Sequence, residues 1–178
     1  MEATSVAFAK FRAIVGTPKE PPARLITNAD QVIQMESSDG LKIWCDGQKP
    51  AKVQEAPRPP EIVPAHLQDQ CLWVVRQDDV VYALEQGTFG KGLESTVIKH
   101  TNLTGGAPAY SGGELLFLDE NTLVVNGQSG RYGPRSQSEM DAVEQAFSES
   151  GYDVWSMGFD EEANFPLPFI GVTPKWVA

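Results

Sequence analysis

Cysteine and histidine are scarce in this chain of 178 residues, which has two of each. Cys45 and Cys71 lie far apart and outside any zinc-binding spacing, so we expect no metal site. Each cysteine lies in an apolar run. That setting favours buried free thiols over a disulfide, and it makes a reducing compartment the default.

Long apolar runs are also missing. No run approaches the roughly 18 residues that a membrane-spanning helix needs. The first residues, 1–6, lack the basic start and apolar core of a cleaved signal peptide. We therefore expect no membrane span, and either a cytoplasmic protein or one delivered by a secretion system that uses no cleaved signal peptide.

Basic residues are in deficit, with 14 Lys and Arg against 24 Asp and Glu and a net charge of −10. Such a charge argues against binding double-stranded DNA, because that binding depends on cations that neutralise phosphates. It allows steering toward a specific protein partner that is itself basic. Acidity also keeps a protein soluble without any partner, and this general explanation stays open.

The clearest pattern runs from residue 100 to residue 162. Apolar runs at 114–118 and 122–126, joined by a short Asp- and Asn-containing connection, predict a β-hairpin. A helix is predicted to begin at Ser138 as its cap and to end at Gly151, with one apolar stripe formed by Met140, Val143, Ala146 and Phe147. The run 152–159 then predicts a strand that returns to the same sheet.

Further elements are predicted on the N-terminal side of this stretch. They are a helix over residues 3–15 with Ala3, Ala7, Phe11 and Ile14 on one face, hairpins at 32–35 with 41–45 and at 71–75 with 80–84, and a strand at 96–100. Five prolines between Pro50 and Pro64 predict an extended linker.

The fold class expected is therefore α+β, with antiparallel hairpins and a C-terminal-half helix packed on the sheet. The expected division is an N-terminal helix-and-hairpin subdomain (1–49), a proline-rich linker (50–64) and a main domain (65–178).

Candidate chemistry gathers at predicted strand ends. His100 can act as acid or base near neutral pH, Arg131 can clamp a phosphate, and Tyr132 can donate a hydrogen bond or stack on a base. Glu114 supplies a carboxylate, and Ser129 with Gly130 forms the loop that would receive a nucleotide. A lone histidine in a strand is more often structural, so a scaffold role for His100 competes with a catalytic one. No pattern points to a particular cofactor.

Three motifs in order resemble a module of bacterial polymorphic toxins and effector-like proteins: residues 99–103, 111–114 and 129–134. The resemblance covers about residues 71–162 and implies a site at His100, Glu114, Ser129, Arg131 and Tyr132. Thr101 and Asn102 stand where that module has Ser-Ser, and Arg131 stands where it has a second histidine. A two-histidine ribonuclease mechanism would therefore lack one acid/base group in this chain.

Two functions remain open at this point. The first is a small bacterial or phage effector, toxin-like in interbacterial competition, with a nucleotide- or RNA-directed site at the sheet mouth. The second is an acidic, non-enzymatic inhibitor, such as an immunity or anti-defence protein, that binds and blocks a basic protein target.

Overall fold

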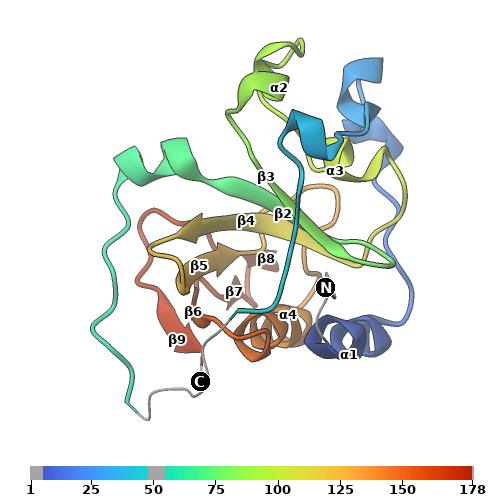
Figure 1. Ribbon diagram of the computed structural model, residues 1–178. Coiled ribbons are helices and arrows are strands. Elements are labelled where there is room, and N and C mark those ends of the chain that lie inside the picture. Colours follow the sequence, from blue (N-terminus) through green and yellow to red (C-terminus); the bar gives the residue numbers. More distant parts are fainter. Residues whose placement is uncertain (1–5, 48–54, 178) are drawn as a thin grey trace.

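The computed structural model describes residues 6–47 and 55–177, and its centre is a seven-stranded sheet in the order β1-β3-β2-β4-β5-β6-β9 (Figure 1). The strands are β1 (Lys42–Ile43), β2 (Cys71–Val75), β3 (Val80–Leu84), β4 (Ser111–Phe117), β5 (Thr122–Asn126), β6 (Asp153–Ser156) and β9 (Lys175–Val177). All neighbours pair antiparallel except β5 and β6. The α+β fold class expected from the sequence is confirmed.

Helix α4 (Gln137–Glu149) makes the one parallel pairing possible, because parallel strands need a crossover between them. Its cap is Ser136, whose side chain accepts the backbone N–H of Glu139 at 3.1 Å, so the predicted cap at Ser138 is wrong by two residues. The predicted stripe is confirmed, since Met140, Val143, Ala146 and Phe147 are all buried.

Helices α1 (Val6–Val15) and α4 lie side by side on one face of the sheet (Figure 1). The core between them and the sheet is rich in aromatic rings: Phe147 meets Phe8, Trp44 and Trp73 edge-on, with ring centroids 5.0–5.1 Å apart. On α1 the buried residues are Ala7, Phe8 and Phe11, whereas the predicted Ile14 is 62% exposed. The predicted Ala3 lies outside the described residues.

Two smaller clusters cover the opposite face. One lies under the short helices η1 (Ala23–Leu25), η2 (Ala29–Val32), η3 (Ser37–Asp39), α2 (Thr88–Lys91) and α3 (Thr101–Thr104). The other lies under η4 (Pro64–Asp69) and the C-terminal tail, where β7 (Phe159–Asp160) pairs with β8 (Phe165–Pro166). Of the aromatic residues in the tail, Phe169 is buried in the second cluster and Trp176 packs against it, whereas Phe165 is 43% exposed.

The segment 6–47, expected to form a subdomain with its own hairpin, instead shares the main core. Residues 29–32 and 37–39 are 3₁₀ turns, and β1 pairs with β3 rather than with residues 32–35. Trp44, directly after β1, is 1% exposed and packs against α4. Its ring also contacts those of Tyr82 and Phe117, so this residue belongs to the aromatic core shared with the sheet. Residues 55–63 form no helix or strand, and 50–54 lie outside the described residues.

None of the helices within the described ranges combines the length and the apolar character that crossing a bilayer requires.

Candidate functional site

His100 lies at the start of α3, not in a strand, because residues 96–100 turn instead of extending. Its ring is 6% exposed, and Nε2 lies 2.8 Å from the carbonyl oxygen of Gly113 on β4. A carbonyl only accepts, so Nε2 must carry a proton and donate it. The pKa of His100 is lowered to about 4, chiefly by burial, while the hydrogen bond to Gly113 raises it and the charges of Arg131 and Lys99 lower it. The imidazole is therefore neutral at pH 7.

Tyr132 is completely buried beside His100. Its hydroxyl donates to the carbonyl oxygen of Ala107 at 2.7 Å and lies 2.8 Å from the Thr104 hydroxyl. Gly112 allows the two rings to approach: a Cβ there would lie 3.1 Å from Cβ of Tyr132 and 3.2 Å from Cδ2 of His100. The structure thus brings these two predicted residues together, in the interior.

Ser129 and Gly130 form the turn that delivers Arg131. The Ser129 hydroxyl accepts the backbone N–H of Tyr132 at 3.1 Å, and its carbonyl accepts that of Gly133 at 3.0 Å. Gly130 is exposed and lies against Leu25. This hydroxyl is therefore used to hold the turn together.

Arg131 fastens the N-terminal segment to this turn. Its Nη2 donates to the carbonyl oxygen of Leu25 at 2.7 Å and to Oε1 of Gln31 at 3.2 Å. Burial lowers the pKa of Arg131. Its Nε is buried and has no hydrogen-bond partner among the described residues, which leaves one donor of the guanidinium unused.

Glu114 directly follows Gly113 on β4 and pairs with Asn126 on β5. Its two carboxylate oxygens accept from the side-chain amides of Asn126 and Gln70, each at 3.0 Å. Burial raises the pKa of Glu114, nearby Glu85 also raises it, and the two amides lower it. Both carboxylate oxygens therefore accept hydrogen bonds from neutral side chains of the sheet and its neighbouring turn, and neither bonds to His100.

The motif residues of the first predicted site connect the N-terminal segment to the rest of the fold. Thr101 donates to the carbonyl of Gln31, and the Asn102 side chain donates to the carbonyls of Asp30 at 2.8 Å and Ile33 at 3.0 Å. With Arg131 they bind residues 25–33 to the sheet. A catalytic role for His100, Glu114, Arg131 and Tyr132 stays a prediction, and their geometry favours support of the fold.

A second site, around Glu144 on α4, was not predicted from the sequence. It is a cavity of about 270 Å³ walled by Phe159, Leu167 and Trp176. Burial raises the pKa of Glu144 to about 7, a hydrogen bond from Ser156 lowers it, Asp141 raises it and Lys175 lowers it. Oε2 of Glu144 is buried without a hydrogen-bond partner within the described ranges. In the sequence, Glu144 is one of several charged residues of an amphipathic helix, so nothing indicates its burial or its raised pKa.

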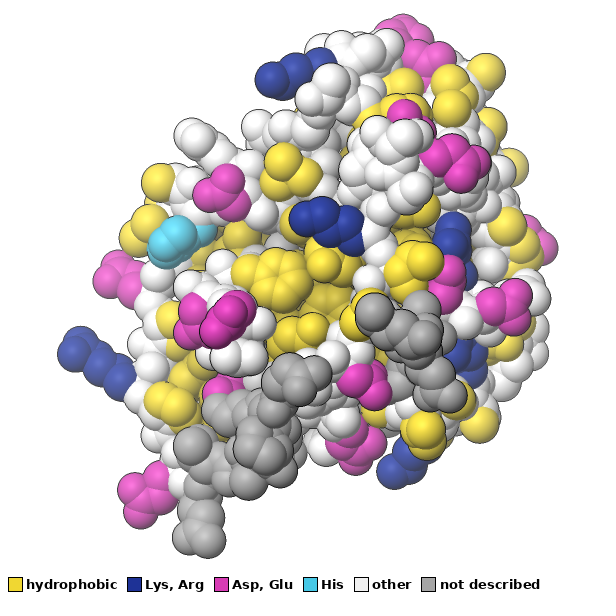
Figure 2. All heavy atoms as spheres, in the orientation of Figure 1, with side chains coloured by type: hydrophobic (Ala, Val, Ile, Leu, Met, Phe, Trp, Pro, Cys, Tyr) yellow, Lys and Arg dark blue, Asp and Glu magenta, His cyan; other side chains and the backbone are white. Residues whose placement is uncertain are grey.

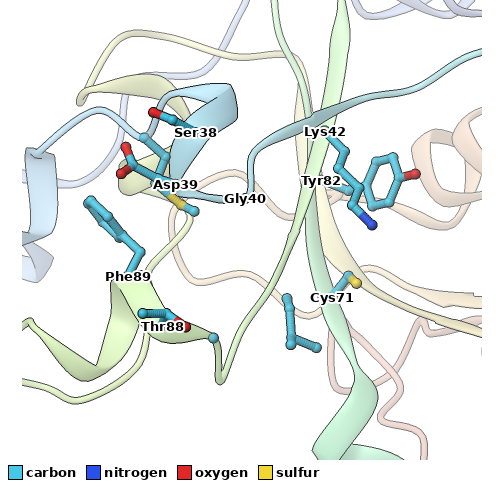
Figure 3. A pocket seen from close by; sticks show the side chains of 11 residues that line it. Ser38, Asp39, Gly40, Lys42, Cys71, Tyr82, Thr88 and Phe89 are labelled. Carbon is cyan, nitrogen blue, oxygen red and sulfur yellow. The ribbon is translucent and has the colours of Figure 1, made fainter.

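A third site is a cavity of about 580 Å³ at the edge of the sheet (Figure 3). Its walls come from β1, β3, η3 and the start of α2. The glycine-rich run 87–92 contributes the short helix α2 to this cavity.

The Asp160 carboxylate closes a turn, because it accepts the backbone N–H groups of Glu162 and Ala163, each at 3.0 Å. Across the ranges 6–47 and 55–177, no three His, Cys, Asp or Glu side chains are grouped so that they could hold a metal ion. Both cysteines are free and partly buried.

Comparison with protein families, with curated proteins and with solved structures finds no match for this chain.

Proposed function

We propose that this protein is an acidic, non-enzymatic inhibitor that binds and blocks a basic protein partner. The observation that carries the proposal is the Glu144 cavity, where a buried carboxyl oxygen has no hydrogen-bond partner among the described residues. An unpaired buried acceptor costs free energy unless a donor arrives, and a Lys or Arg side chain of a partner is such a donor.

The cavity suits a basic side chain in its shape as well as its charge. The rings of Trp176 and Phe159 can pack against an aliphatic stem, and an aromatic face attracts a cation. Exposed Asp141 lies at the same cavity on the preceding turn of α4. Lys175 also lines it, and because Lys175 is exposed it can swing into solvent when another cation enters.

The surrounding surface extends the negative charge. Glu161 and Glu162 are exposed directly after β7, which packs against α4. The last turn of α4 contains Glu149 and no basic residue, although a helix C-terminus favours cations. An acidic residue at this end lowers the stability of the helix, and residues that lower stability in this way are typical of functional surfaces.

The buried state of the predicted catalytic residues supports a binder over an enzyme. His100 and Tyr132 are at most 6% exposed, so a substrate cannot reach them without a rearrangement of the loop 100–107.

The test is affinity capture with the wild type, with Glu144→Gln and with Glu120→Gln as a control, an exposed carboxylate in the turn between β4 and β5 and outside the cavity. We expect basic proteins to bind the wild type and the control in a salt-sensitive way, and to be lost with Glu144→Gln. A captured protein must then lose its own activity when purified inhibitor is added in equal amount. Capture that is unchanged by Glu144→Gln would contradict the proposal.

A second candidate is the toxin-like effector with a nucleotide- or RNA-directed site. The observation in its favour is the unused Nε of Arg131 close to His100. Incubating the purified protein with NAD, nucleoside triphosphates and RNA tests it. Turnover that falls in a folded Arg131→Met variant would support the effector and count against the inhibitor.

A further inference from the structure

The sheet-edge cavity is enclosed by segments that are distant in sequence. Lys42 and Tyr82 stand opposite each other on β1 and β3, while Ser38, Asp39, Thr88 and Phe89 approach from the other side (Figure 3). Its volume of about 580 Å³ falls within the range of roughly 300–1,000 Å³ that is typical of small-molecule sites.

Apolar side chains make up much of the cavity wall. Met35 and Phe89 belong to the cluster beneath the short helices, and Leu84 at the end of β3 is 42% exposed. Together they give the cavity an apolar wall, which is typical of small-molecule sites. Figure 2 shows apolar side chains gathered in a hollow near the centre of one face.

The polar groups of this cavity differ in whether they have hydrogen-bond partners within the protein. The Asp39 carboxylate accepts the backbone N–H of Glu36 at 2.9 Å. By contrast, Lys42 is exposed, and its ammonium forms no hydrogen bond or ion pair with any residue that the structure describes. Burial raises the pKa of the nearby Cys71 thiol to about 11, so that thiol is neutral and gives Lys42 no counter-charge.

Charge and shape together define the ligand. Lys42 is an unpaired cation at one end of a mostly apolar cavity, and Asp39 stands at the far side of it (Figure 3). We propose that this cavity binds a small organic anion, with an aromatic or branched apolar body over Leu84 and Phe89 and one carboxylate that meets Lys42. This site is separate from the Glu144 cavity and does not depend on the proposed inhibitor function.

The experiment uses 2-naphthoate as the anionic probe and 2-naphthamide as its uncharged counterpart, titrated into the full chain by calorimetry. We expect saturable one-site binding of naphthoate and binding of the amide weaker by about tenfold, the effect of losing one charge-assisted hydrogen bond. Lys42→Met should weaken naphthoate by a similar factor. The matched control is Lys10→Met, which removes the same charge from an exposed position of α1 outside the cavity.

A second variant, Leu84→Trp, fills the cavity without changing charge and should abolish binding of both probes. Circular dichroism confirms that each variant is folded. Naphthoate that fails to bind, or that binds equally to the wild type, Lys42→Met and Leu84→Trp, would overturn the proposal. Equal affinity for naphthoate and naphthamide would overturn the anionic part of it.

Discussion

Lys19 and Glu139 form an ion pair inside the protein although they lie 120 residues apart. Their side chains are 4% and 12% exposed. The Lys19 ammonium also donates to the carbonyl of Tyr110 at 2.7 Å, and its backbone exchanges two hydrogen bonds with Ala109. Burial lowers the pKa of Lys19, while the hydrogen bond and charge of Glu139 raise it. The pair ties the chain after α1 to the first turn of α4.

Removing one partner of this pair should be costly. We expect Lys19→Met to lower the free energy of unfolding by about 3–5 kcal/mol, because it leaves a buried carboxylate unpaired. The double variant Lys19→Met/Glu139→Gln should recover part of that loss. Urea unfolding measures both, with Lys10→Met as the exposed control. A loss below about 1 kcal/mol, the range of exposed pairs, would show that the pair is solvated.

His100 should make the protein sensitive to mild acid. In the unfolded chain its pKa is near 6.5, and in the folded protein burial lowers the pKa to about 4. Between these values the unfolded state binds more protons, so stability falls as the pH falls. The expected loss from this residue is about 2 kcal/mol between pH 7 and pH 5. In His100→Asn this contribution disappears, which urea unfolding at the two pH values would detect. An unchanged difference between pH 7 and pH 5 would rule out the buried neutral imidazole.

Glu144 should act with the opposite sign. Its pKa is raised to about 7 in the folded protein against 4.5 for the unfolded group. The folded state therefore binds more protons between these values, and stability falls as the pH rises through 7. Glu144→Gln should gain about 3 kcal/mol over the wild type at pH 8 and little at pH 4. Glu149→Gln is the control. From pH 5 to pH 7 the opposite effects of His100 and Glu144 on stability nearly cancel, so only the single variants reveal each effect.

Local patterns predicted the elements whose partners are near in sequence. The hairpins β2–β3 and β4–β5, and α4 with its buried stripe, follow from alternation, turn residues and helical spacing. The 32–45 hairpin failed because β1 finds its partner in β3, about 40 residues away, and Trp44 completes the aromatic core. Residue spacing within the segment carries no information on that pairing.

The candidate site was harder to predict for a related reason. His100, Arg131 and Tyr132 do converge, as the motif order suggested. The sequence cannot show whether they meet at the surface or in the interior of the protein. Here their donors meet backbone carbonyls of Gly113, Leu25 and Ala107. The raised pKa of Glu144 depends on burial by β6 and the C-terminal tail, which no local pattern encodes.

Two glycines of the motifs should differ sharply in their tolerance of alanine. A Cβ at Gly113 would lie 2.0 Å from the carbonyl oxygen of Asn126 and 2.8 Å from the Trp73 ring. Both neighbours are fixed within the sheet, so Gly113→Ala should cost more than about 3 kcal/mol and displace the carbonyl that holds His100. At Gly130 a Cβ would meet only the end of the Leu25 side chain, at 3.3 Å. Gly130→Ala should therefore change stability by less than about 1 kcal/mol. Thermal and urea unfolding of the two variants compares them directly, and equal losses would show that β4 can shift to admit a side chain.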